Sequence, residues 1–112
     1  PEIIKFGDKW HMYYSLVTKN GLAVSSDGLS FKERPMTGND VGGIPGALAL
    51  PDGVRIYGCQ VGISSALSKD GITFQKDTHN VFSTPQQGLI CDPSIIRMSD
   101  GKFAIVYKAR PQ

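Results

Sequence analysis

Apolar and polar residues alternate over short segments of the chain, and turn residues separate these segments. The clearest alternation places Trp10, Met12 and Tyr14 on one face of a strand. The same spacing recurs near the end of the chain at Phe103, Ile105 and Tyr107. A two-residue period with turn residues every ~8–12 residues is typical of antiparallel sheet, and no stretch of about ten residues has the period of a helix. We therefore expect an all-β fold.

The chain contains internal repeats. Residues 22–31 and 65–74 share the pattern A-[VL]-S-x-D-G-[LI]-[ST]-F at an offset of 43 positions. A second element, in which an apolar segment, an Asp/Gly turn and another apolar segment follow a proline, occurs three times. Its prolines are Pro1, Pro45 and Pro93, which lie 44 and 48 residues apart. Repeats of about 40–50 residues are typical of β-propellers, in which each repeat forms a four-stranded blade.

Each repeat predicts four strands. The first strand begins at the proline, and an Asp/Gly turn leads from it into the second. The third strand is expected at 21–25 and 63–68, and the Asp-Gly turn of the repeat leads to the fourth at Phe31 and Phe74. We predict a β-propeller fragment of about 2.5 blades. Its parts are a blade at 1–34, a connector at 35–44, a blade at 45–77, a connector at 78–92 and a half blade at 93–107.

Two motifs resemble those of known propellers. The repeated S-x-D-G-x-[ST]-F segments resemble the Asp-box turns of sialidase-like propellers, which usually have one more residue between Asp and Gly. The segment 92–96, Asp-Pro-Ser-Ile-Ile, with the later Asp-Gly-Lys-Phe turn, resembles the arabinanase- and fructosidase-like glycoside hydrolases and their uncharacterised bacterial relatives. This resemblance covers nearly the whole chain. It implies a propeller of five blades when complete and a carbohydrate ligand.

The repeated Asp-Gly turns predict a structural role. Their aspartates can accept hydrogen bonds from backbone N–H groups of their own turn, their glycines can adopt positive φ without steric strain, and their phenylalanines can pack between neighbouring sheets. The residues concerned are Asp27, Gly28 and Phe31 in the first blade and Asp70, Gly71 and Phe74 in the second.

The other face of the propeller is expected to hold any ligand. In an up-and-down blade, the loops between strands two and three lie with the blade-to-blade connectors on the face opposite the Asp-Gly turns. In the enzymes that this chain resembles, the substrate binds on that face over the central channel. Asp92 lies there at the start of an innermost strand. The resemblance implies that Asp92 acts as general base, nucleophile or transition-state stabiliser; the alternative is an Asp that caps the turn before Pro93.

Three further charged residues are candidates for ligand binding, namely Asp40, Arg110 and Glu2. Glycoside hydrolysis usually needs two carboxylates that flank the scissile bond, but the residue before Pro45, in the position of Asp92, is Ile44. The catalytic set is therefore incomplete in this sequence. A glycosidase-like piece, a sugar-binding propeller without activity, and a structural or interaction domain without a small ligand all remain open.

Composition and motifs argue against several other classes of function. The net charge is +2 without a run of Lys or Arg, which argues against nucleic-acid binding. The longest apolar stretches have about six residues, too few to span a membrane. There is no metal motif, phosphate-binding loop or nucleophile elbow, and the two histidines, His11 and His79, have no partner pattern, so we expect no cofactor.

Two features concern stability and assembly. Cys59 and Cys91 are expected to be buried thiols, although a disulfide stays open because it requires a short Cα–Cα distance. A fragment of about 2.5 blades exposes the faces of its terminal sheets, with Trp10 and Met12 or Phe103 and Ile105 on them. We therefore expect two copies to associate into one ring of five blades. The alternative is an excerpt of a longer propeller, with which the start at Pro1 is consistent; the compartment stays open.

Overall fold

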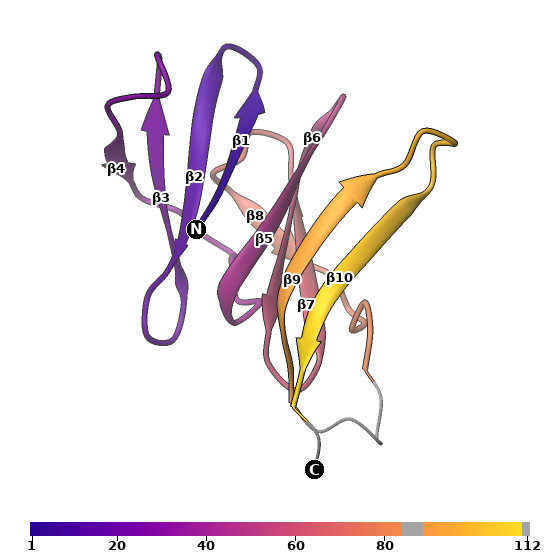
Figure 1. Cartoon of the computed structure of the whole chain (residues 1–112). Helices are drawn as coiled ribbons and strands as arrows, with labels where there is room; N and C mark the ends of the chain where they lie inside the picture. Colours follow the sequence, from indigo (N-terminus) through magenta and orange to yellow (C-terminus); the bar gives the residue numbers. More distant parts are fainter. Residues whose placement is uncertain (84–88, 111–112) are drawn as a thin grey trace.

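The computed structural model describes residues 1–83 and 89–110, which form ten strands in three antiparallel sheets (Figure 1). The first sheet has β1 (Glu2–Phe6), β2 (Lys9–Ser15), β3 (Asn20–Ser25) and β4 (Lys32–Arg34) in that order. The second has β5 (Gly43–Leu50), β6 (Gly53–Cys59), β7 (Ile63–Ser68) and β8 (Phe74–Lys76). The third pairs β9 (Ile90–Arg97) with β10 (Phe103–Ala109).

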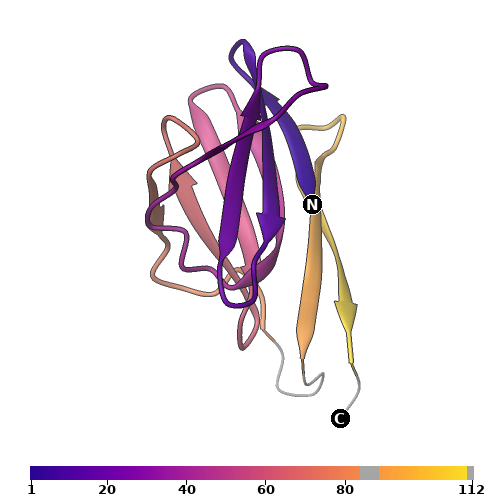
Figure 2. The same ribbon diagram turned by 90° about the vertical axis from the view of Figure 1, so that its left-hand side faces the viewer.

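The three sheets are arranged side by side, as propeller blades are. The first strand of the second sheet, β5, contacts the first strands of both neighbours, β1 and β9. Figure 1 shows the β1–β2, β3–β4 and β9–β10 turns at one end of the sheets and the β2–β3 and β6–β7 turns at the other. In the turned view of Figure 2 the first sheet lies in front of the second. Among the described residues no helix is long and apolar enough to cross a membrane.

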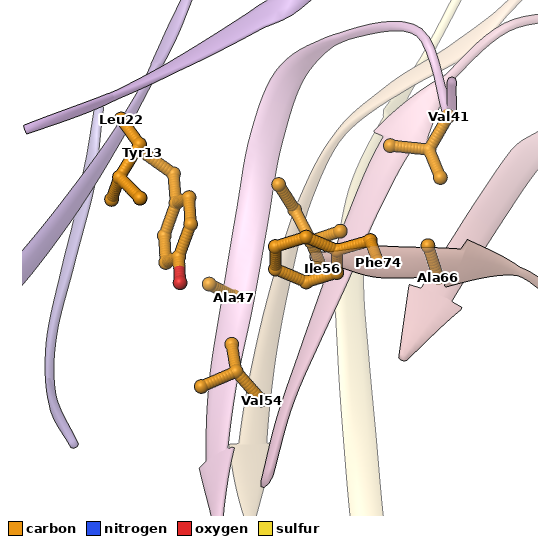
Figure 3. Packing of buried hydrophobic residues seen from close by; sticks show 8 residues of the cluster. All are labelled: Tyr13, Leu22, Val41, Ala47, Val54, Ile56, Ala66 and Phe74. Carbon is orange, nitrogen blue, oxygen red and sulfur yellow. The ribbon is translucent and has the colours of Figure 1, made fainter. Parts of the chain in front are cut away.

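A hydrophobic core joins the first two sheets. Tyr13 and Leu22 of the first sheet point toward Ala47, Ile56 and Phe74 of the second (Figure 3), and all five are buried. The Tyr13 and Phe74 rings meet edge to face with centroids 6.0 Å apart. Strand β2 alternates as its sequence predicts. His11 and Tyr13 are buried on one face, and the opposite face holds three partly exposed side chains, those of Trp10, Met12 and Tyr14.

A second core joins the half blade to the second sheet. Ile95 of β9 and Ile90 at its start pack with Tyr57 and Ile63 of the second sheet, and all four are buried. The partly buried Ile105 of β10 packs against this cluster. Ile105 was one of the residues that a terminal face could expose, but it lies against the second sheet because it shares the inner face with Ile95, its register partner.

The ladders differ from the predicted strands at several ends. Strand β3 begins at Asn20, one residue early, and β10 continues to Ala109, two residues beyond the predicted half blade. Strand β4 begins at Lys32, one residue after Phe31. Strands β5 and β9 begin at Gly43 and Ile90, inside the segments predicted as connectors. The latter two extend beyond their prolines because a bulge lets pairing continue around a residue without an N–H group.

The repeated Asp-Gly turns share one hydrogen-bond pattern. In the second blade the N–H groups of Ile72 and Thr73 both donate to Asp70 Oδ1 at 2.8 Å, and Ser68 Oγ donates to the same oxygen at 2.9 Å. In the first blade the corresponding groups donate to Asp27 Oδ1 at 2.9–3.0 Å. These bonds hold the pKa of Asp27 down to about 2 and also lower the pKa of Asp70. The geometry supports a turn-forming role for both aspartates.

Only the second of these turns is bound to another blade among the described residues. Tyr13 of the first sheet donates its hydroxyl hydrogen to the Gly71 carbonyl oxygen at 2.7 Å, and His11 Nδ1 lies 3.3 Å from the same hydroxyl. Gly71 has φ +77°, and a Cβ there would lie 2.8 Å from the His11 ring. The Asp70 turn therefore fixes the first blade against the second.

We predict that Asp70→Ala lowers the free energy of unfolding by about 1–2 kcal/mol, since it removes the acceptor of the turn. Urea denaturation measures this. The matched control is Asp27→Ala, which should have a smaller effect because its turn has no Tyr13 anchor. The folded-state pKa of Asp70 lies below its unfolded value of 3.8, so its contribution is present above pH 4 and is lost as the pH falls through the folded pKa. Equal stability of wild type and Asp70→Ala at pH 7 would contradict the structural role.

Candidate functional site

The innermost strands of the second and third sheets contain the same β-bulge. On β5 the register moves from Gly43↔Cys59 to Gly46↔Tyr57, so that Ile44 and the following proline oppose one residue of β6. On β9 it moves in the same way around Asp92 and its following proline, which oppose one residue of β10. Ile44 has φ 54° and Asp92 has φ 53°. They are the two residues other than glycine with positive φ among those described.

The shared bulge determines where the Asp92 carboxyl group lies. A bulge with its first residue in the left-handed region usually has Gly there. Asp tolerates this conformation because its short side chain can bond locally, whereas the β-branched Ile44 is strained in it. The same backbone in two blades shows that the bulge belongs to the blade and not to the carboxyl group. Asp92 is exposed and occupies a bulge of the kind that often redirects a side chain beside an active site.

The residue before Asp92 is covalently bound to the second sheet. Cys91 forms a disulfide with Cys59 at the end of β6, with a Cα–Cα distance of 4.9 Å. The expectation of two buried thiols was wrong, and both cysteines are partly exposed. The end of β6 and the start of β9 lie close together because the half blade packs beside the second sheet. The spacing of the two cysteines in the sequence does not reveal this proximity. The disulfide restrains the start of β9, where Asp92 lies.

Two of the other candidates lie near this end of β9. The backbone carbonyl oxygen of Asp40 accepts a hydrogen bond from Gln60 Nε2 at 3.4 Å, and Gln60 follows the disulfide-bonded Cys59. The backbone N–H of Arg110 donates to the Leu89 carbonyl oxygen at 2.9 Å, which places Arg110 at the last turn of the β9–β10 ladder. Both side chains are exposed. Backbone contacts thus bring Asp40 to the end of β6 and Arg110 to the start of β9.

Glu2 lies on a different innermost strand. It begins β1, in register with Tyr13, and β5 lies between β1 and β9 (Figure 1). Burial raises the pKa of Glu2, and the positive N-terminal ammonium group partly opposes this rise. A partly buried carboxyl group with a raised pKa can hold a proton at higher pH than an exposed one. Glu2 is therefore separated by one blade from Asp92 and differs from it in environment.

A polar network beside the disulfide was missed by the sequence analysis. Gln60 Oε1 accepts hydrogen bonds from Lys76 Nζ at 3.0 Å and from Ser64 Oγ at 3.4 Å, and Ser64 Oγ also lies 3.2 Å from Asn80 Oδ1. These residues come from a loop, two strands and a connector. Single polar residues at such separations leave no sequence motif. No group of three or more potential metal ligands occurs in the part of the chain that the structure describes.

Comparison with known proteins identifies the fold of the chain but does not assign it to a family. No protein-family model and no curated protein matches the chain. Its structure is similar to the crystal structure of a thermostable family-43 glycoside hydrolase, with a TM-score of 0.76 at 15% sequence identity. The fold is that of a β-propeller. The match covers 96% of this chain and 40% of that enzyme.

The similarity is one of fold and involves part of a longer enzyme. The propeller fragment spans 40% of the length of the hydrolase that it resembles. At 15% identity the likeness concerns the course of the backbone and transfers no residue role. The all-β architecture of about 2.5 blades predicted from the repeats is confirmed, with sheets of four, four and two strands.

Proposed function

We propose that this chain is a carbohydrate-directed piece of a five-bladed, glycosidase-like propeller, with Asp92 as the central polar group of its site. The observation that carries the proposal is the position of Asp92, an exposed carboxylate in the left-handed residue of a bulge at the start of an innermost strand. The disulfide at the preceding residue restrains it from one side. Similarity to the backbone of a glycoside hydrolase supports carbohydrate as the ligand class.

The chemistry available at this site depends on a second acid. An ionised Asp92 can accept hydrogen bonds from sugar hydroxyl groups or remove a proton from water during hydrolysis. Hydrolysis also needs an acid that protonates the leaving group. Glu2, whose pKa is raised by burial, is the candidate for this role within the chain. Both carboxyl groups must flank the same glycosidic bond, roughly 5–9.5 Å apart. Since β5 lies between the two strands, hydrolysis with these two groups requires their side chains to approach one another across the end of β5.

We predict that Asp92→Asn abolishes sugar binding at this site while the fold survives, because the amide has the shape of the acid without its charge and changes no buried contact. A glycan array with wild type and variant measures the effect, and circular dichroism verifies the fold. Asp40→Asn, on the same face, is the matched control and should have a smaller effect. If a glycan bound both wild type and Asp92→Asn equally, Asp92 would lie outside the site.

One observation favours an interaction domain without a small ligand as the second candidate. Val17 and Val61 lie at the tips of the β2–β3 and β6–β7 turns and are 102% and 90% exposed. Exposed aliphatic residues at corresponding turn tips of two blades are more typical of a contact with a protein than of sugar recognition, which uses aromatic rings and polar groups. Absence of any glycan binding by the wild type, under conditions that keep it folded, would favour this candidate.

A further inference from the structure

A cleft of about 430 Å³ lies on the first blade, away from Asp92. It opens where the β2–β3 turn meets the end of β4 and the connector after it, at the end of the sheet that also holds the start of β1. Its polar lining comes from Lys19 of the turn, Asn20 of β3, Glu33 and Arg34 of β4, and Asn39 of the connector. None of these residues belongs to the proposed Asp92 site, so the ligand of this cleft is a separate question.

Asn20 has a buried polar atom that lacks a partner. Its side chain is 3% exposed, and Nδ2 donates to the Gly42 carbonyl oxygen at 2.7 Å. This bond fixes the amide plane, since rotating it would leave the Gly42 carbonyl without its donor. Asn20 Oδ1 accepts no hydrogen bond from the residues that the structure describes. A buried acceptor without a donor is unfavourable, so a ligand at this position gains from bringing an O–H or N–H group.

The rest of the lining indicates what kind of donor fits. Tyr14 donates its hydroxyl hydrogen to Glu33 Oε1 at 2.7 Å, a bond that raises the pKa of Tyr14. The Tyr14 ring lies over Gly21, where a Cβ would come within 2.5 Å of it. The cleft thus combines a carboxylate and an amide oxygen as acceptors, Lys19 and Arg34 as donors, and an aromatic ring. An anion would face both acceptors, and a cation would face Lys19 and Arg34.

We propose that this cleft binds a neutral sugar, with one hydroxyl group donating to Asn20 Oδ1 and others bonding to Glu33 and Arg34. A sugar carries donors and acceptors on one small ring and an apolar face that can pack on Tyr14. Asn20 is buried beside the β2–β3 turn, so admitting the hydroxyl group requires a local shift, for which this turn is the nearest exposed segment. That turn is exposed throughout residues 15–19, and Leu16 N–H donating to the Lys19 carbonyl oxygen at 2.7 Å is a bond across its base.

The experiment is a titration of the ¹⁵N-labelled chain, followed by NMR, with arabinose, xylose and fructose in turn. For at least one sugar we expect the amide signals of Lys19, Gly21 and Asn39 to move together along one binding curve. Glu33→Ala, an exposed change, should weaken binding by about tenfold or more, as expected for loss of a hydrogen bond to a charged group. Asn20→Leu removes the acceptor and should abolish binding if the variant folds.

Two controls distinguish sugar binding in this cleft from binding at Asp92 and from attraction of any anion. Asp92→Asn should leave the titration unchanged, so failure of the Asp92 site and failure of this proposal are distinguishable. Inorganic phosphate, which would bind a merely basic cleft, should not move the same signals. The proposal is overturned if no sugar moves them, if phosphate moves them and sugars do not, or if wild type and Glu33→Ala bind a sugar equally.

Discussion

Reduction of the Cys59–Cys91 disulfide is expected to lower the free energy of unfolding by about 3–4 kcal/mol. The bond closes a segment with a sequence separation of 32, and in the chain-entropy account a loop of that length restricts the unfolded chain by this amount. This is a large fraction of the stability of a small domain. The bond also joins two blades, so its loss should act on one part of the molecule first.

The half blade is the part expected to open. Strands β9 and β10 pair with one another, and they contact the second sheet through the cluster of Ile90 and Ile95 with Tyr57 and Ile63. The first sheet has four paired strands and the larger core. Without the disulfide, amide hydrogens of β9 and β10 should therefore exchange faster, while those of β2 and β3 stay protected.

The measurement is urea denaturation with and without dithiothreitol, together with hydrogen exchange followed by mass spectrometry. The Cys59→Ser/Cys91→Ser double variant is the control: it should match the reduced wild type and be insensitive to the reductant. An unchanged midpoint on reduction, or faster exchange spread evenly over all three sheets, would show that the disulfide does not hold the half blade.

The fold was predictable because its signals are local and repeated. The hydrogen-bond pattern of a repeated turn such as Ser68–Phe74 can be predicted from the residues of the turn itself. The two-residue alternation of apolar and polar residues likewise predicts the strands. The ends of β5 and β9 were not predictable in this way. A strand that continues before its proline requires a bulge, and no propensity rule places the β-branched Ile44 in the left-handed region that this bulge uses.

The candidate site was only partly predictable, since its parts come from different blades. Asp92 carried a signal in its position before a repeated proline. The pairing of Cys59 with Cys91 depends on how neighbouring blades stack, and the orphaned acceptor of Asn20 depends on a contact with Gly42. Contacts of this kind arise from the packing of sheets and produce no recognisable pattern of residue spacing in the sequence.

Self-association of the chain is the second large effect that we expect, and it depends on surfaces that the three sheets leave uncovered. The half blade contacts chiefly β5 and β6 of the second sheet. Beside β7 and β8 lies a hollow of about 690 Å³ that includes Leu67, which is 40% exposed, and the outer part of β8. On the opposite face of the second sheet, by contrast, Ala66 of β7 is buried in the core shared with the first sheet.

Both terminal sheets also have an uncovered face. Ile96 and Val106 on the outer face of the half blade are 53% and 66% exposed, and Ile3 on the outer face of the first sheet is 50% exposed. In addition, β10 pairs with β9 alone among the described strands, so its other edge can accept a further strand. Two copies of about 2.5 blades supply the material for one ring of five. Further blades of the same polypeptide, where present, would cover the same surfaces.

Light scattering on the purified 112-residue chain at micromolar concentration should therefore give a mass of about 24 kDa, twice the 12.1 kDa of one copy. In urea denaturation the midpoint of unfolding should rise with protein concentration. The double variant Ile96→Lys/Val106→Lys should shift the mass toward one copy, because it places two charges on a face that the ring must bury. Leu29→Lys is the matched control: Leu29 is 87% exposed on the β3–β4 turn and not on a sheet face, so this variant should keep the mass of the wild type. A folded wild-type monomer, with unfolding that does not depend on concentration, would contradict closure by self-association, because the uncovered faces would then be stable in water without a partner.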